Sequence, residues 1–177
     1  RSGNVRWKNC HRDWRMRCLF DARSLIMHEL VHGLGFEIHH FQQAGGARSC
    51  AESDRCPVEE RTYTDQYGSA DPDTGLLTDT VWVVVASRVL IKAREFFGCE
   101  TLDALPLRGS KQLGDSSRDN HWETRILNDE FMAYGEGGQI SAITLAMMEE
   151  LGHYLADYSQ AQCMLWGGNQ GCEFVET

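Results

Sequence analysis

Two histidines and a glutamate, His28, Glu29 and His32, stand in one short apolar segment between Leu25 and Phe36. On a helix, residues four apart lie one above the other, so His28 and His32 can present ring nitrogens to a single ion. Glu29 would lie beside that ion, where its carboxylate can take a proton from a metal-bound water. The pattern His-Glu-x-x-His is typical of zinc peptidases, and it predicts zinc ligands at His28 and His32 and a general base at Glu29.

A helix over residues 21–36 must position these side chains, with Asp21 as its N-cap and Gly35 near its C-terminal end. Its remaining residues are largely apolar, so we expect the helix to be mostly buried. Buried histidine and glutamate are costly without partners, and a shared metal ion removes that cost. The alternative is an amphipathic core helix whose histidines are surface residues or are satisfied by hydrogen bonds. The apolar residues are Leu25, Ile26, Leu30, Val31, Leu34 and Phe36.

A catalytic zinc usually takes three protein ligands and one water, so a third ligand is needed. A longer form of the motif places a third histidine three residues after the glycine, but that position is Ile38. His39 and His40 miss it by one and two residues. Some zinc peptidases use a glutamate from a downstream helix instead, although such glutamates are more often solvent-facing charges. The downstream candidates are His121, Glu149 and Glu150.

Three segments follow one another in a definite order: His-Glu-Leu-Val-His-Gly-Leu-Gly-Phe at 28–36, Asn-His-Trp-Glu-Thr-Arg at 120–125, and Asn-Asp-Glu-Phe-Met-Ala at 128–133. A long insertion separates the first from the second. This order resembles the leishmanolysin family of metzincin zinc peptidases, including its animal leishmanolysin-like (invadolysin) members. The similarity continues through residues 93–99, 143–152 and 166–174, so it covers most of the chain from about Leu25 onward.

The resemblance implies that His121, which follows the insertion, is the third zinc ligand. It also implies that Met132 is the methionine of the turn beneath the metal, although on its own a methionine in this setting is core filler. Tyr134 follows Met132 by two residues, in a placement similar to the tyrosine that stabilises the oxyanion in astacin-like metzincins. Leishmanolysins generally lack that tyrosine, so the alternative is a hydrogen-bonded turn residue.

The expected fold class is α+β: a metzincin-like zincin catalytic core, mainly helical, with a loop-rich insertion and with its N-terminal sheet largely missing. The 177 residues fit one globular unit, which we interpret as a partial metallopeptidase catalytic domain over 1–177. Only residues 4–8 could supply the last strand of the sheet, so we expect a fragment of a longer enzyme. The expected parts are the zinc-binding helix (21–36), the loop-rich insertion (39–78), the third-ligand loop and Met-turn (117–134), and the C-terminal helix and tail (141–177).

Within this frame, β-branched residues at 81–85 predict a strand, and residues 87–97 predict a helix that Ser87 caps and Gly98 ends. A single helix through both segments is the alternative. Residues 141–151 have apolar side chains at helical spacing and are expected to close the core behind the site. Cys50 and Cys56 are candidates to pin the insertion.

Charge and cysteine content limit the kinds of partner and the cellular locations that we expect for this protein. A net charge of −9 makes nucleic acid an improbable partner, because binding to its backbone needs clustered Lys and Arg. Seven cysteines favour disulfides in a secreted or cell-surface protein, and the odd count leaves at least one without an internal partner. No apolar stretch approaches the ~20 residues of a membrane span. Membrane association would need segments absent here, and a cytoplasmic location is the alternative.

The sequence thus predicts a zinc-dependent metalloendopeptidase that uses one catalytic zinc ion to hydrolyse peptide bonds in protein or peptide substrates. One alternative is a non-catalytic adhesion or binding module derived from such a protease. Another is a zinc-stabilised structural domain with a fourth protein ligand, for which His39 or His40 would be available.

Overall fold

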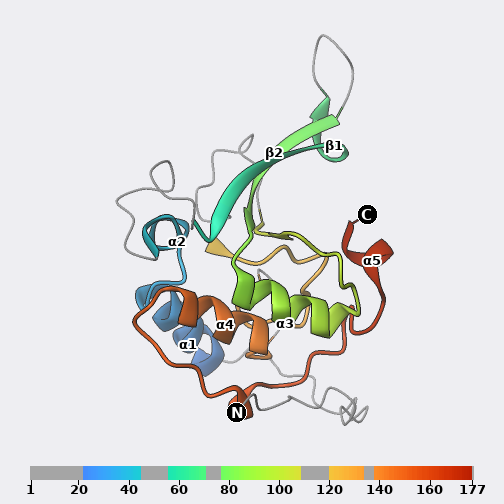
Figure 1. Ribbon diagram of the computed structural model, residues 1–177. Helices are drawn as coiled ribbons and strands as arrows, with labels where there is room; N and C mark the ends of the chain where they lie inside the picture. The colour runs from blue at the N-terminus through green and yellow to red at the C-terminus, as the bar shows by residue number, and fades with distance from the viewer. Residues whose placement is uncertain (1–21, 45–55, 71–76, 109–119, 134–137, 177) are drawn as a thin grey trace.

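The computed structural model describes residues 22–44, 56–70, 77–108, 120–133 and 138–176. Its helices are α1 (Ala22–Gly33), α2 (Ile38–Gln43), α3 (Ser87–Phe97), α4 (Ala142–Glu150), the 3-10 helix η6 (Tyr158–Gln160) and α5 (Cys172–Glu176). Its strands are β1 (Val58–Ala70), β2 (Leu77–Val84) and β3 (Leu105–Pro106). This mixture of helices and a small antiparallel sheet agrees with the expected α+β class (Figure 1). Among the described helices, none has the length and apolar character needed to cross a bilayer.

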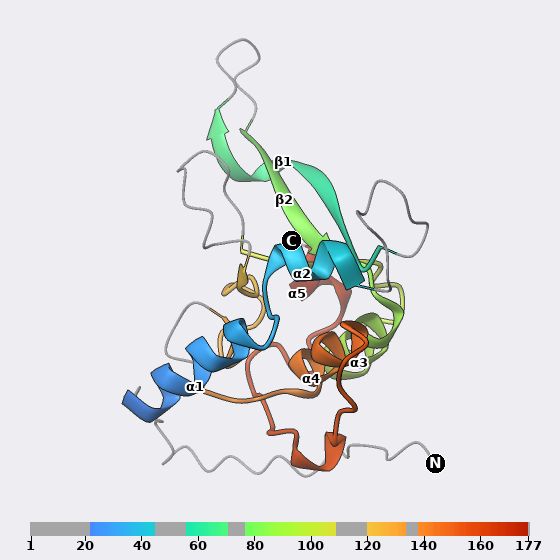
Figure 2. The same ribbon diagram turned by 90° about the vertical axis from the view of Figure 1, so that its left-hand side faces the viewer.

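The sheet has the strand order β1-β2-β3, with antiparallel neighbours. Val58 lies opposite Val84, and the β1–β2 hairpin projects away from the helices in both views (Figure 2). Strand β3 pairs with the C-terminal end of β2, where Val84 lies opposite Leu105. Just beyond β3, Leu107 forms an isolated antiparallel bridge with Trp122. The sheet therefore anchors the segment that carries His121.

The prediction of a loop-rich insertion at residues 39–78 is wrong for most of the residues that the structure describes there. Residues 38–43 form α2, and residues 58–70 and 77–78 belong to the hairpin. The polar composition of this segment does not indicate a strand. An exposed hairpin is stabilised by backbone hydrogen bonds between its strands and by cross-strand side-chain pairs rather than by burial of apolar residues. Thr62 and Thr80, for example, bring their hydroxyl oxygens within 2.9 Å of each other. The suggested role of Cys50 concerns a residue outside the described part of the chain.

The strand and helix predicted within residues 81–98 are both confirmed, and a single helix through both is wrong. Ala86, not Ser87, occupies the N-cap position of α3, and no side chain caps it. Gly98 ends α3 in the left-handed conformation with φ at 71°, where glycine avoids the steric cost of a Cβ atom.

Helices α3 and α4 lie side by side at the centre of the core (Figure 1). Helix α4 follows Ser141, whose hydroxyl oxygen accepts hydrogen bonds from the backbone N–H groups of Ile143 and Thr144. The same core includes Trp122 and Met132, so the segment 120–133 packs against these helices. The buried apolar residues of the two helices are Val89, Leu90, Ala93, Phe96, Phe97, Ala142, Ile143, Ala146 and Met147.

Helix α1 is less buried than its composition predicts. The side chain of Ile26 is 61% exposed, whereas His28 is only 8% exposed. The helix's own apolar residues are spread around its whole circumference. Hydropathy alone therefore does not show which of its faces the core covers. Helix α1 also ends at Gly33, before the predicted limit of 36, because the chain turns through Gly35 at a φ of 116°. The predicted N-cap, Asp21, lies outside the described residues.

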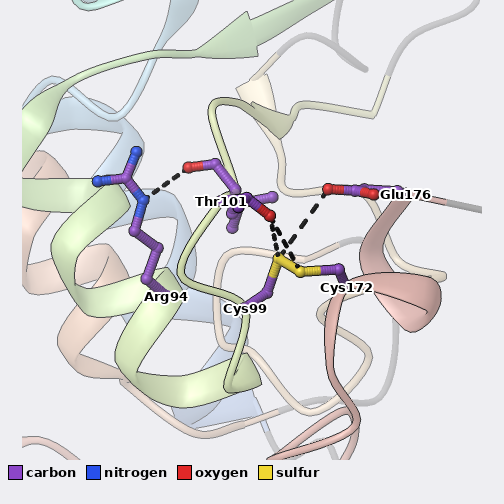
Figure 3. The surroundings of a disulfide bond; sticks show 6 residues. Arg94, Cys99, Thr101, Cys172 and Glu176 are labelled. Carbon is purple, nitrogen blue, oxygen red and sulfur yellow. Dashed lines mark hydrogen bonds between the residues drawn. A yellow bond between two sulfur atoms is a disulfide. The ribbon is translucent and has the colours of Figure 1, made fainter.

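A disulfide joins Cys99, just after α3, to Cys172 at the start of α5, across a sequence separation of 73 residues (Figure 3). The hydroxyl oxygen of Thr101 lies 3.2 Å from the sulfur of Cys172. Cys56 and Cys163 are also disulfide-bonded. The prediction of disulfides is therefore confirmed, while Cys10, Cys18 and Cys50 lie outside the described residues.

Glu130 is fully buried and links the segment 120–133 to α4. One carboxylate oxygen accepts hydrogen bonds from the N–H and hydroxyl of Ser141 at 3.1 and 2.8 Å, and the other accepts from the N–H of Met132 at 2.5 Å. The hydroxyl of Thr144 also bonds to Glu130 and accepts from the indole N–H of Trp122 at 2.8 Å. Burial raises the pKa of Glu130, and these hydrogen bonds oppose the rise.

We expect Glu130→Gln to lower the free energy of unfolding by about 1–3 kcal/mol, because an amide NH2 would face at least one donor and leave it unsatisfied in the core. Urea denaturation measures this change. Glu100→Gln, at an exposed glutamate, is the matched control and should shift stability by less than about 0.5 kcal/mol. Equal stability of the two variants would contradict the structural role given to Glu130.

Replacing both Cys99 and Cys172 with alanine should destabilise the chain by about 4 kcal/mol, because the disulfide restricts a long loop in the unfolded state. The free energy of unfolding of the double variant, compared with that of the parent under oxidising conditions, measures the effect. A loss below about 1 kcal/mol would show that this disulfide contributes little to the fold.

Candidate metal centre

His28 and His32 lie one turn apart on α1, on the face that the core covers. Their Nε2 atoms are 3.1 Å apart. His28 is buried and His32 is half-buried. Both imidazoles therefore point toward the same place, as the helical spacing predicts.

His121 meets this pair from a segment 89 residues beyond His32. Its Nε2 atom lies 3.0 Å from that of His28 and 3.2 Å from that of His32. Its backbone carbonyl accepts a hydrogen bond from the N–H of Arg108 at 2.8 Å. The neighbouring Asn120 accepts a hydrogen bond from the N–H of Ile38 at 2.9 Å. Contacts on both sides thus hold His121 beside α1.

Two backbone carbonyls fix the protonation of the paired histidines. The Nδ1 of His28 lies 2.8 Å from the carbonyl oxygen of Phe131, and the Nδ1 of His32 lies 2.8 Å from that of Phe36. A carbonyl oxygen only accepts, so each Nδ1 carries the proton and donates it. In neutral rings, the Nε2 atoms of His28 and His32 then present lone pairs to each other, with no proton between them. Burial lowers the pKa of His28 and favours this neutral form.

A metal ion satisfies this arrangement. In a tetrahedral zinc site with bonds of about 2.0–2.1 Å, ligand atoms are separated by about 3.3 Å. The three Nε2 separations, 3.0 to 3.2 Å, are close to that value. Imidazole is a preferred zinc ligand, and an Nδ1–H bonded to a carbonyl is the usual support of such a ligand. The residues present therefore fit a zinc site with three histidine ligands.

Glu29 follows His28 on α1 and is exposed. Its negative charge acts on His28 and partly opposes the effect of burial on that histidine's pKa. Among the residues that the structure describes, no hydrogen bond or ion pair engages the carboxylate of Glu29. Glu29 therefore offers a solvent-accessible carboxylate directly after His28 on the helix.

Met132 is completely buried next to the site. Its carbonyl oxygen accepts a hydrogen bond from the N–H of Trp122 at 3.0 Å, and it directly follows Phe131, whose carbonyl orients His28. Met132 therefore belongs to the turn that follows His121 and contacts His28 through the carbonyl of Phe131. Tyr134 lies outside the described residues.

The other candidates for the third ligand have different contacts. The carboxylate of Glu149 accepts a hydrogen bond from the hydroxyl of Tyr158 at 2.6 Å, and Glu150 pairs with Arg88 at 3.2 Å. His39 and His40 are exposed and gather with Glu37 rather than with the three histidines. Another group of potential ligands, Cys99, Cys172 and Glu176, has no thiolate to offer because its sulfurs form the disulfide (Figure 3).

Sequence reasoning missed the groups that orient two of the histidines, the carbonyls of Phe36 and Phe131. It also missed two side chains that hold the His121 segment in place, Asn120 and Glu130. Every residue has a carbonyl, so no sequence signal marks the two that act here. Glu130 did have a signal, because it is an acidic residue that directly precedes the apolar run Phe-Met-Ala. An acid at such a position needs several donors if the fold buries it.

Comparison with known proteins identifies the family. The peptidase M8 family, leishmanolysin, matches residues 18–177. Leishmanolysin of Leishmania chagasi is 34% identical over 152 residues, which cover 85% of this chain and 22% of that protein. The leishmanolysin-like peptidase of Drosophila melanogaster is 30% identical over 170 residues, which cover 86% of this chain and 25% of that protein.

The chain thus spans about a quarter or less of the length of these curated relatives. The family match covers the α1 histidines, His121 and the turn at Met132 in one continuous region. On these matches, the chain belongs to the leishmanolysin family of peptidases.

Proposed function

We propose that residues 1–177 form part of the catalytic domain of a zinc-dependent metalloendopeptidase, with His28, His32 and His121 as the zinc ligands. One observation carries the proposal: three imidazole Nε2 atoms converge within 3.2 Å of one another. The proton positions of His28 and His32 leave lone pairs at that point of convergence. Family membership supports the same conclusion, because the named relatives are peptidases.

In the proposed mechanism, a bound zinc ion would lower the pKa of a water molecule toward ~7 and polarise the scissile carbonyl. Glu29 accepts the proton of the attacking water and passes it to the leaving amine, which is the role of a general base and then of a general acid. The carbonyls of Phe36 and Phe131 keep Nδ1 of His32 and His28 protonated, so that both Nε2 atoms remain available as ligands.

Further roles belong to this proposal. Met132 packs in the turn beneath the site. Tyr134 is the candidate to stabilise the oxyanion, and the alternative is a hydrogen-bonded turn residue. Substrates are proteins or peptides. The disulfides support an extracellular or cell-surface location, because such bonds persist in oxidising compartments.

Glu29→Gln should keep zinc bound and reduce peptide cleavage by about 10²- to 10⁴-fold, because the amide cannot take the proton. The zinc content of the purified variant and its cleavage of a generic fluorogenic peptide test this, with a chelator-treated parent as reference. Glu95→Gln, at another exposed helical glutamate, should retain full activity. If Glu29→Gln lost its zinc but still cleaved the peptide, Glu29 would not be the base.

His121→Ala should weaken zinc binding by more than about 100-fold, because loss of a ligand costs more than loss of its supporting hydrogen bond. Competition with a chromophoric chelator measures the affinity. His153→Ala, at an exposed histidine outside the group of three, should bind its first zinc ion with the same affinity as the parent. Unchanged affinity in His121→Ala would exclude His121 as a ligand. Tight zinc without cleavage in the parent would favour a binding module derived from a protease.

A further inference from the structure

Glu37, His39 and His40 form a second cluster of potential metal ligands that the proposed catalytic site does not use. One ligand atom from each residue lies within 4.8 Å of the others. The Nδ1 atom of His39 is 2.9 Å from a carboxylate oxygen of Glu37, and the rings of His39 and His40 have their centroids 4.0 Å apart. Glu37 immediately precedes α2, and both histidines belong to that helix.

We propose that Glu37, His39 and His40 bind a second divalent transition-metal ion, such as Zn²⁺, independently of the three-histidine centre. Two imidazoles and one carboxylate form a known zinc ligand set, and the carboxylate offsets part of the charge of the ion. This site is more exposed than the first, so we expect it to bind more weakly and to fill only when zinc exceeds the amount that saturates the first.

The geometry needs only a small adjustment to accept an ion. Ligand atoms around zinc are separated by about 3.3 Å, less than the 4.8 Å limit of this cluster. The side chains of His39 and Glu37 are 54% and 31% exposed, so their rotamers can change without disturbing the core. The carboxylate of Glu37 makes no capping hydrogen bond to α2 that would have to be broken. A cavity of about 230 Å³ lies on one side of this cluster, where His40 lines it together with Gln43 and His153.

The cluster also lies on the segment that supports the first site. The carbonyl of Phe36 accepts the Nδ1–H of His32, and the N–H of Ile38 donates to Asn120, the neighbour of His121. Glu37 stands between these two anchor points. An ion bound there would restrain the residues that hold His32 and His121 together, without sharing a ligand with them.

Isothermal titration of the full chain with Zn²⁺, beyond one bound equivalent, tests the proposal. The parent should bind a second, weaker equivalent, and its thermal unfolding midpoint should rise with zinc concentration as this site fills. His39→Ala and Glu37→Gln should each weaken the second event by more than about tenfold while retaining the first. Retention of the first event also shows that these variants are folded.

His121→Ala separates this proposal from the proposed function, because it should lose the first event and keep the second. Absence of a second event in the parent would overturn the inference. Binding of the second zinc equivalent by both His39→Ala and Glu37→Gln would also overturn it. So would loss of the second equivalent in His153→Ala together with its retention in His39→Ala. In either case the ion would be held by different residues.

Discussion

The convergence of three imidazole nitrogens is the constraint on which the site depends. The Nε2 atoms of His28, His32 and His121 lie within 3.2 Å of one another, and carbonyl acceptors hold the protons of the first two rings on Nδ1. Lone pairs that face each other in this way repel unless a cation lies between them. The fold therefore holds these ring nitrogens in an arrangement that a bound metal ion would stabilise. Such preorganisation lets a site bind zinc without first rearranging.

Much of the surrounding structure keeps this arrangement in place. The segment that carries His121 is bonded to the sheet region through Arg108, to the α2 region through Asn120, and to α4 through the buried carboxylate of Glu130. The Cys99–Cys172 disulfide then joins the end of α3 to α5. The site is thus assembled from parts of the chain that meet only in the folded state, whereas a helical pair alone would supply two ligands.

The sequence predicted some of these features and not others, for physical reasons. The spacing of His28 and His32 follows from helical geometry and needs no tertiary information. His121 was expected from family resemblance alone, because nothing in local spacing connects residues 89 positions apart. The long hairpin was missed because its strands are polar and its stability comes from pairing. The burial of α1 was overestimated because composition does not reveal which faces of an apolar helix the core covers.

The most direct test of the central claim is X-ray absorption spectroscopy of the chain loaded with one equivalent of zinc. We expect three imidazole nitrogens and one oxygen from water, all at about 2.0–2.1 Å from the metal. A sulfur ligand at about 2.3 Å, or a shell with fewer than three imidazoles, would contradict the three-histidine centre. A fourth protein ligand in place of water would instead indicate a structural zinc site, which could not perform the proposed hydrolysis.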